Sequence, residues 1–293
     1  MNKYRWLSEI SIVSLSLLLI GCTGVNTPTP PKETLSLPAI TKSATDKHYS
    51  GKFVWHDLLT DDITKAKAFY GGLLGWRFED MNHYSTIYND GKLIGGMMEV
   101  AAKTGSASEA VWLPSMSVKG IENAVKYVER KGGKVLKGPL DMQERGKGVL
   151  ISDPHGAHIV LLQAKGGDPL DATPRIGDWL WNELWSKYPK ESDAFYRKLG
   201  HYDSSISRED YLILIHKGEW RAGIRHVVRD DIDEHWVPVI RVDNPQKLLS
   251  KVEKLGGKVL MKPDQSLMNG DVAVIADNSG AHLILQRWSE GKK

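Results

Sequence analysis

The sequence predicts an α+β fold built from two copies of one domain, and three observations lead to this expectation. Trp55-His56-Asp57-Leu58 recurs, 126 residues later, as Trp181-Asn182-Glu183-Leu184. Gly132-Gly133-Lys134-Val135-Leu136 recurs in the same order as Gly256-Gly257-Lys258-Val259-Leu260. Within each copy, apolar residues change between the spacing of strands and the spacing of helices.

The first half of each copy predicts one strand, one helix and three strands. Residues 52–60 are rich in aromatic and branched residues and predict a strand. A helix follows, because Asp61-Asp62 can cap it and the next apolar residues have helical spacing: Ile63, Ala66, Phe69 and Tyr70. Gly75 ends this helix. Three short strands are expected around residues 76–79, 83–88 and 92–99, with a hairpin turn at Asn89-Asp90-Gly91.

The second half of the copy repeats this order. Residues 111–118 predict a strand, and a helical stripe of apolar residues ends at Gly132-Gly133. Strands are expected at residues 134–136, 148–151 and 158–163. Each copy therefore consists of two βαβββ units, and the chain contains four.

Composition excludes several classes of protein. The 293 residues are 41% hydrophobic and 26% charged, which is ordinary for globular domains. The net charge of +3 comes from interspersed charges without a basic stripe, so nucleic acid is not expected as a partner. No glycine cluster has the spacing of a nucleotide-binding loop, and the single cysteine, Cys22, excludes an internal disulfide. The sequence gives no indication of the oligomeric state.

The first residues have the pattern of an export signal. Lys3 and Arg5 precede an apolar run over residues 10–20, which is too short to cross a bilayer, so residues 1–21 predict a signal peptide. Its end, Leu19-Ile20-Gly21-Cys22, resembles the lipobox of bacterial lipoproteins. The resemblance implies cleavage before Cys22, acylation of that residue (palmitate among the chains) and attachment to the lipid bilayer of the cell envelope. In a Gram-negative cell it implies the outer membrane, because Thr23 and not Asp follows the cysteine. Residues 22–49 are rich in Pro, Thr and Ser and predict a flexible tether.

The repeated motifs resemble those of the vicinal oxygen chelate superfamily, which contains glyoxalases, bleomycin-resistance proteins and extradiol dioxygenases. The tandem, hydroxylase-like bacterial members are the most similar. The resemblance covers residues 50–165 and 176–289, and it implies two domains in which two βαβββ units form an open, barrel-like cleft. The motifs that carry it are Phe53-Val54-Trp55-His56-Asp57-Leu58, Ala68-Phe69-Tyr70, Leu74-Gly75-Trp76, Trp112-Leu113-Pro114 and Asp153-Pro154-His155-Gly156-Ala157.

In metal-dependent members, His, Gln and Glu ligands come from the first and last strands of each unit. The resemblance places these positions on side chains that do not bind hard or borderline divalent cations. We therefore expect no metal and no cofactor in either domain. A register shift of one residue would bring His56 inward, with Asn182 at the equivalent place, but one histidine is not a site. The positions are Trp55, Leu113, Val160 and Met97 in the first domain and Trp181, Val237, Ile284 and Ile224 in the second.

Other side chains are expected to face the clefts. Strand alternation places a tryptophan and a carboxylate on one face, and a histidine two residues from the last-strand position shares that face. Such a set can contact a ligand, and a carboxylate beside a histidine can act as a general base, which makes Asp57, His158, Glu183 and His282 weak catalytic candidates. The alternative is that these groups only brace turns and sheet edges. The candidate ligand-binding residues are Trp55, Asp57 and His158 in the first domain and Trp181, Glu183 and His282 in the second.

Three functions remain open from the sequence. The favoured one is a membrane-anchored protein that binds a small molecule in a tryptophan-lined cleft without the metal of the superfamily. The alternatives are a lyase or dioxygenase type of enzyme, either metal-dependent or acid–base, and a scaffold for protein interactions. If only one cleft binds, we expect the first, because the Pro-containing turn at residues 153–157 is replaced in the second copy.

Overall fold

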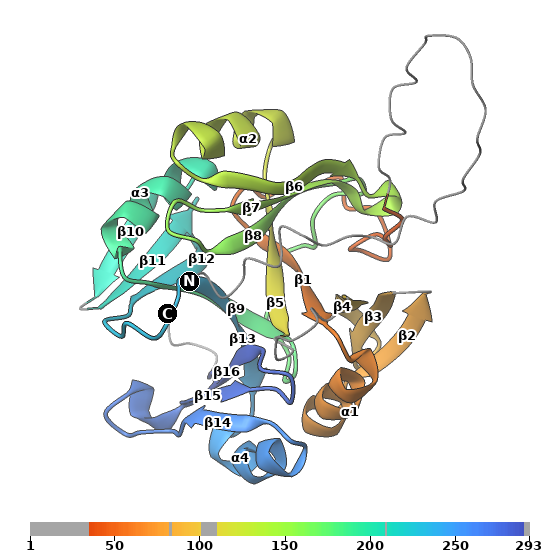
Figure 1. The fold of residues 1–293 in the computed structure, drawn as a ribbon, viewed down its shortest axis with the longest axis vertical. Coiled ribbons are helices and arrows are strands. Elements are labelled where there is room, and N and C mark those ends of the chain that lie inside the picture. Colours follow the sequence, from red (N-terminus) through yellow and green to blue (C-terminus); the bar gives the residue numbers. More distant parts are fainter. Residues whose placement is uncertain (1–34, 82–83, 101–109, 209, 290–293) are drawn as a thin grey trace, which may run out of the picture.

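The computed structural model describes residues 35–81, 84–100, 110–208 and 210–289. They form two open sheets of eight strands each, one for each predicted domain (Figure 1). The strand orders are β2-β3-β4-β1-β5-β8-β7-β6 and β10-β11-β12-β9-β13-β16-β15-β14. The order is the same in both sheets, which confirms the α+β fold with four βαβββ units. No helix of the described residues is long and apolar enough to span a membrane.

The first sheet follows the predicted elements closely. Asp62 caps the first helix by accepting a hydrogen bond from the backbone N–H of Lys65, and Gly75 ends it with φ of 75°. The hairpin turn has positive φ at Asp90 and Gly91, as its sequence predicts. The elements are β1 (Phe53–Thr60), α1 (Ile63–Leu74), β2 (Arg77–Met81), β3 (Tyr84–Asn89), β4 (Lys92–Glu99), β5 (Val111–Ser117), α2 (Ile121–Arg130), β6 (Lys134–Asp141), β7 (Gly146–Ser152) and β8 (His158–Ala164), with a 3-10 turn, η2 (Gln143–Arg145), before β7.

The second sheet repeats this order. Its two helices each begin with a proline, where the missing N–H has no cost. The elements are β9 (Trp179–Ser186), α3 (Pro189–Leu199), β10 (Ser204–Arg208), β11 (Tyr211–His216), β12 (Glu219–His226), β13 (His235–Val242), α4 (Pro245–Lys254), β14 (Lys258–Met261), η3 (Met268–Gly270), β15 (Val272–Ala276) and β16 (His282–Arg287).

Each sheet has an inner face, which carries the predicted cleft residues, and an outer face, which carries the helices. Paired residues of adjacent strands share a face, and the pairs Asp57 with Leu113 and Trp55 with Ser115 define the first inner face. The pairs Glu183 with Val237 and Trp181 with Val239 define the second inner face.

The two domains share their cores across the outer faces. Helix α1 packs beside α4, and α2 packs beside α3, so each helix of one domain meets a helix of the other (Figure 1). Phe69 and Tyr70 of α1 belong to one buried cluster with Ile275 and Leu283 of the second domain. The tandem copies are therefore two sheets but not two independent cores.

Two equivalent hydrogen bonds between tyrosine and aspartate also join the domains, one in each direction. The Tyr70 hydroxyl donates to Oδ2 of Asp277 at 2.9 Å, and the Tyr196 hydroxyl donates to Oδ2 of Asp153 at 3.1 Å. Burial raises the pKa of both carboxyl groups, and the tyrosine and backbone donors oppose this rise. Buried polar groups that are paired in this way fix the relative position of the domains.

His56 lies on the outer face and not in the cleft. Its Nε2 is 2.8 Å from Oδ1 of Asn182, the equivalent residue of the second domain, and its ring stacks on Trp179. Burial lowers its pKa to about 4, although the Asn182 contact opposes this shift. The motif residue His56 therefore joins the two domains, and the register that would bring it inward does not occur.

Residues 35–49, which we expected to belong to the flexible tether, lie against the first sheet. Leu37 and Ile40 are buried, and Thr45 and Asp46 donate backbone hydrogen bonds to the carbonyl of Gly166. The pattern of Pro, Thr and Ser concealed these apolar residues. The signal peptide, Cys22 and the rest of the predicted tether lie outside the described residues.

Candidate functional site

The inner faces carry three of the four side chains of each domain that the resemblance assigned to metal positions. Trp55, Leu113 and Val160 share the first inner face, because Trp55 pairs with Ser115 and Ser115 pairs with Val160. The same pairings place Trp181, Val237 and Ile284 on the second inner face.

The fourth predicted position was wrong by one residue in both domains. Met97 pairs with Leu58 and is buried in the outer cluster, and Ile224 pairs with Leu184 in the same way. The next residues, Met98 and Arg225, face inward instead, since side chains alternate along a strand.

These residues do not fit a divalent cation. Within the described residues, no three His, Cys, Asp or Glu side chains come together in a way that could hold a metal ion. Indole and aliphatic groups are not ligands for such ions. In addition, a guanidinium group occupies each inner face, and its positive charge opposes binding of a second cation.

A buried polar network fills the first inner face. Asp57 accepts hydrogen bonds at Oδ1 from the Trp55 indole at 2.9 Å and from the Tyr84 hydroxyl at 2.5 Å. Arg145 donates from Nη1 to Oδ2 of Asp57 at 2.9 Å and from Nη2 to the Tyr84 hydroxyl at 2.7 Å. The Arg145 guanidinium also lies over the Trp55 ring, 4.7 Å from its centroid. Each polar group is thus satisfied by another member of the network.

The backbone of Gly96 lies close to the Tyr84 hydroxyl, and this close approach makes the network possible. A Cβ atom at Gly96 would lie 1.7 Å from the Tyr84 hydroxyl, so only glycine leaves space for that tyrosine. Burial lowers the pKa of Arg145, but the neighbouring Tyr84 and Asp57 raise it more, so the cation persists. Burial raises the pKa of Tyr84, and the phenol stays neutral.

The second inner face carries a similar set of groups. Arg225 donates to Glu183 from Nε at 2.6 Å and from Nη2 at 3.1 Å. The Trp185 indole donates to the same carboxylate at 2.8 Å, and the Trp181 indole donates to the Tyr211 hydroxyl at 2.7 Å. The arginine comes from β12 here and from η2 in the first domain, so two different elements supply the same cation.

The two faces differ in exposure. The side chains of Trp55 and Arg145 are 1% and 2% exposed, so the first inner face presents neither to solvent. The Arg225 side chain is 32% exposed, and Trp181 and Trp185 are half-buried. The sequence favoured the first cleft if only one binds; among the described residues, the half-buried rings of Trp181 and Trp185 lie on the second inner face.

The predicted pairs of carboxylate and histidine do not form. Leu113 lies between Asp57 and His158 in the sheet, and Asp57 is bound by Trp55, Tyr84 and Arg145. Burial lowers the pKa of His158 to about 4, which is opposite to the effect of a nearby carboxylate. His158 lines a cavity of only about 10 Å³ between the two domains, together with Val111, Trp112, Leu113, His235 and Trp236.

His282 has a histidine partner in place of Glu183. Its Nδ1 is 3.0 Å from Nε2 of His235, and both rings lie against Trp185. Strand β13 lies between the strands that carry Glu183 and His282. Its residue Val237 pairs with Glu183, and its residue Val239 pairs with Ile284, so Val237 separates His282 from Glu183.

Five residues of these networks were not predicted, although the sequence gave a partial signal for three of them. Tyr84 and Tyr211 recur at matching places of the repeat, and Trp185 follows Glu183 at the spacing of one strand face. The arginines gave no such signal, because Arg145 aligns with Asn269 and Arg225 aligns with Met98. Only contacts between distant segments identify them.

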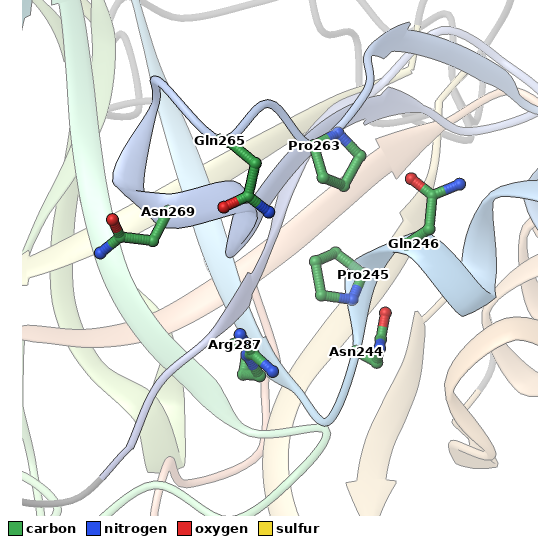
Figure 2. A pocket seen from close by; sticks show the side chains of 8 residues that line it. Asn244, Pro245, Gln246, Pro263, Gln265, Asn269 and Arg287 are labelled. Carbon is green, nitrogen blue, oxygen red and sulfur yellow. The ribbon is translucent and has the colours of Figure 1, made fainter.

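A second cavity, of about 250 Å³, lies at the start of α4 and beside η3 (Figure 2). Its lining is polar and contains none of the predicted site residues. Arg287 is held by Asp271 through two of its nitrogens, within hydrogen-bonding distance. The lining residues are Asn244, Pro245, Gln246, Pro263, Gln265, Asn269, Gly270 and Arg287.

Comparisons with known proteins agree with this fold. A family model described as the Glyoxalase/Bleomycin resistance protein/Dioxygenase superfamily matches residues 48–161. A Mycobacterium tuberculosis protein named "Putative glyoxylase CFP32" is 27% identical over 237 residues, which cover 78% of this chain and 91% of that protein. The anthracycline biosynthesis protein DnrV of Streptomyces peucetius is 24% identical over 261 residues, 82% of this chain and 94% of that protein.

Solved structures extend the similarity to both domains. The Mn(II)-bound glyoxalase from Novosphingobium aromaticivorans has a TM-score of 0.56 at 12% identity and covers 82% of this chain and 83% of its own. The 2,3-dioxygenase LapB from Pseudomonas sp. KL28 has a TM-score of 0.54 at 12% identity and covers 83% and 93%. Residues 48–161 therefore match the model of the glyoxalase, bleomycin resistance protein and dioxygenase superfamily, and the second half of the chain repeats the fold of the first.

Proposed function

We propose that this chain binds a small molecule on the second inner face. The observation that carries this proposal is the partly exposed set of Trp181, Trp185 and Arg225. In the first domain the aligned residues Trp55 and Leu59 are buried, and so is Arg145, which supplies the guanidinium there. Aromatic rings with a fixed polar group beside them are typical of small-molecule sites.

The chemistry of this face suggests the class of ligand. Indole rings favour a flat, unsaturated body, by stacking or edge contacts. The two bonds to Glu183 use two of the five N–H donors of Arg225, so a hydrogen-bond acceptor on the ligand can use others. We propose a flat aromatic molecule that carries a carbonyl or hydroxyl group. The relative named for anthracycline biosynthesis supports this class, because anthracyclines are flat and aromatic.

We also propose that binding needs no divalent cation. The inner-face positions carry indole, aliphatic and guanidinium groups, as described above. Metal analysis of the purified chain should therefore find no stoichiometric Mn, Fe, Ni or Zn. One equivalent of any of them, retained after dialysis, would contradict this part of the proposal.

The site is proposed to be held at the cell envelope. Cleavage before Cys22 and acylation of that cysteine would anchor the chain by several acyl chains, at ~0.8 kcal/mol for each buried methylene. In a Gram-negative cell, the proposed location is the outer membrane. Mass spectrometry of the N-terminal peptide tests this, because an unmodified Cys22, or a Cys22→Ser variant that remains in the membrane fraction, would argue against the anchor.

A titration tests the binding site. 1,4-Dihydroxyanthraquinone is added to the chain while tryptophan fluorescence is followed. We expect saturable quenching, and a Trp181→Leu variant should bind at least tenfold more weakly, since loss of aromatic contact costs on the order of 1 kcal/mol or more. Trp76→Phe is the control, because Trp76 is buried on the outer side and donates to the Gly177 carbonyl. Equal affinity in the Trp181→Leu variant would refute the site.

One observation favours an acid–base enzyme as the second candidate. His235 and His282 are 3.0 Å apart beside Trp185, so a proton could pass between a ligand and this pair. The relative named as a glyoxylase suggests the assay, which is turnover of the adduct of methylglyoxal and a thiol. Turnover that is lost in His282→Gln and kept in His158→Gln would favour the enzyme over the binding protein.

A further inference from the structure

The first inner face is covered by the chain's own residues 35–41. Leu37 and Ile40 are 5% and 4% exposed and lie in one cluster with Trp55 and Tyr84. The remaining buried members of this cluster are Val54, Met142, Leu162 and Ala164. Two branched aliphatic side chains of residues 35–41 thus fill the apolar part of this face.

The backbone of the same residues occupies a polar position. Nε of Arg145 donates to the carbonyl oxygen of Pro38 at 3.2 Å. Nη1 and Nη2 of Arg145 donate to Asp57 and Tyr84, so the Pro38 carbonyl gives the third nitrogen of this buried cation a partner. A carbonyl oxygen and adjacent apolar side chains are the groups that a bound ligand would supply.

The charges of Arg145 and Asp57 restrict which group can accept the hydrogen bond from Nε of Arg145 in place of the Pro38 carbonyl. Asp57 already balances Arg145, so a carboxylate would leave an excess negative charge in a buried position, which is costly. A neutral carbonyl adds no charge and still accepts the hydrogen bond. The site therefore suits an uncharged amide, as in a peptide bond, with branched aliphatic groups beside it.

Residues 35–41 are held loosely compared with the sheet that they cover. To the rest of the described chain they make two backbone hydrogen bonds, from Leu35 to Asp141 at 3.2 Å and from Leu37 to Met142 at 3.4 Å. Residues 35–39 belong to no helix or strand. Segments with few hydrogen bonds open at a lower free energy than the core strands.

We infer that the first inner face is a second binding site, for short uncharged peptides or amides with branched aliphatic groups, and that residues 35–41 occupy it as an intramolecular ligand. In the second domain Asn269 aligns with Arg145, and Asn269 lines the cavity beside α4. An attached ligand acts at an effective concentration in the millimolar range, so the site is closed unless these residues are displaced.

The experiment uses the mature chain from residue 22 with Cys22→Ser and a fluorescent peptide with the sequence of residues 34–41 and with both ends blocked, so that it carries no charge. In a Leu37→Ser/Ile40→Ser variant the covering residues lose their apolar anchors, and the peptide should bind saturably, at least tenfold more tightly than to the unsubstituted chain. The matched control is Leu170→Ser/Val228→Ser, which changes two exposed apolar residues and should bind as weakly as the unsubstituted chain. A peptide with serine at positions 37 and 40 should not bind.

Equal affinity for the double variant and the control would overturn the inference. Hydrogen exchange on the unsubstituted chain provides a second test that does not depend on the folding of the variant. Amides of residues 35–41 should exchange at least 100-fold faster than those of β1 (Phe53–Thr60), and addition of the unsubstituted peptide should not slow exchange in β1 further. Equal exchange rates in residues 35–41 and β1 would show a fixed part of the fold and would also overturn it.

Discussion

Replacement of Arg145 by methionine tests the network of the first inner face. The side chain is 2% exposed and donates to Asp57, Tyr84 and the Pro38 carbonyl. Methionine keeps much of the volume but leaves the Asp57 carboxylate buried without its cation. Breaking a buried ion pair from one side costs about 3–5 kcal/mol, so we expect the free energy of unfolding to fall by this amount.

The Asp57→Asn substitution in the same chain should restore part of this loss. Once the carboxylate is neutral, the remaining cost is that of the lost hydrogen bonds, about 1 kcal/mol each. The assay is urea denaturation followed by far-UV circular dichroism, with the coupling energy taken from the double-mutant cycle. We expect coupling of about 1–3 kcal/mol. Arg145→Met with a loss under about 1 kcal/mol, or additive single variants, would refute the buried network.

Three other predictions follow from the fold. The pKa of His56 falls from 6.5 unfolded to about 4 folded, so its contribution is present above pH 6.5 and is lost as the pH falls toward 4. By the linkage relation this loss of stability reaches about 3 kcal/mol. In a His56→Gln variant the urea midpoint should therefore depend less steeply on pH. An unchanged slope would contradict the burial of His56. Gly96→Ala should lower the free energy of unfolding by about 1–3 kcal/mol or more through the clash with Tyr84, whereas Gly120→Ala, with open space around its Cβ, should cost much less; equal losses in thermal melts would contradict the packing. Residues 50–165 expressed alone should lack a cooperative thermal transition, because their core includes residues of the second domain; a sharp transition would show independent domains.

The order of the elements could be predicted because it depends on local patterns. The cap at Asp62, the turn at Asp90-Gly91 and the stop at Gly75 each require particular residues at a particular backbone geometry, and these residues are visible in the chain. The internal repeat then indicated that the second half has the same order. The inward direction of Trp55 and Asp57 followed from strand alternation in the same way.

The candidate site was less predictable because it depends on distant contacts. Arg145 comes from a 3-10 turn 88 residues from Asp57, and nothing in its local pattern shows that it enters the first inner face. His158 was assigned to Asp57 because both face inward, but the width of an intervening strand separates them. The covering residues 35–41 were missed because a proline-rich composition does not reveal which apolar side chains find a surface.

A crystal structure of the chain with 1,4-dihydroxyanthraquinone would show directly which inner face binds the molecule. We expect one molecule on the second inner face, against Trp181 and Trp185 and within hydrogen-bonding distance of Arg225, with residues 35–41 still covering the first inner face. A molecule against Trp55 on the first inner face, with the second face empty, would contradict this expectation.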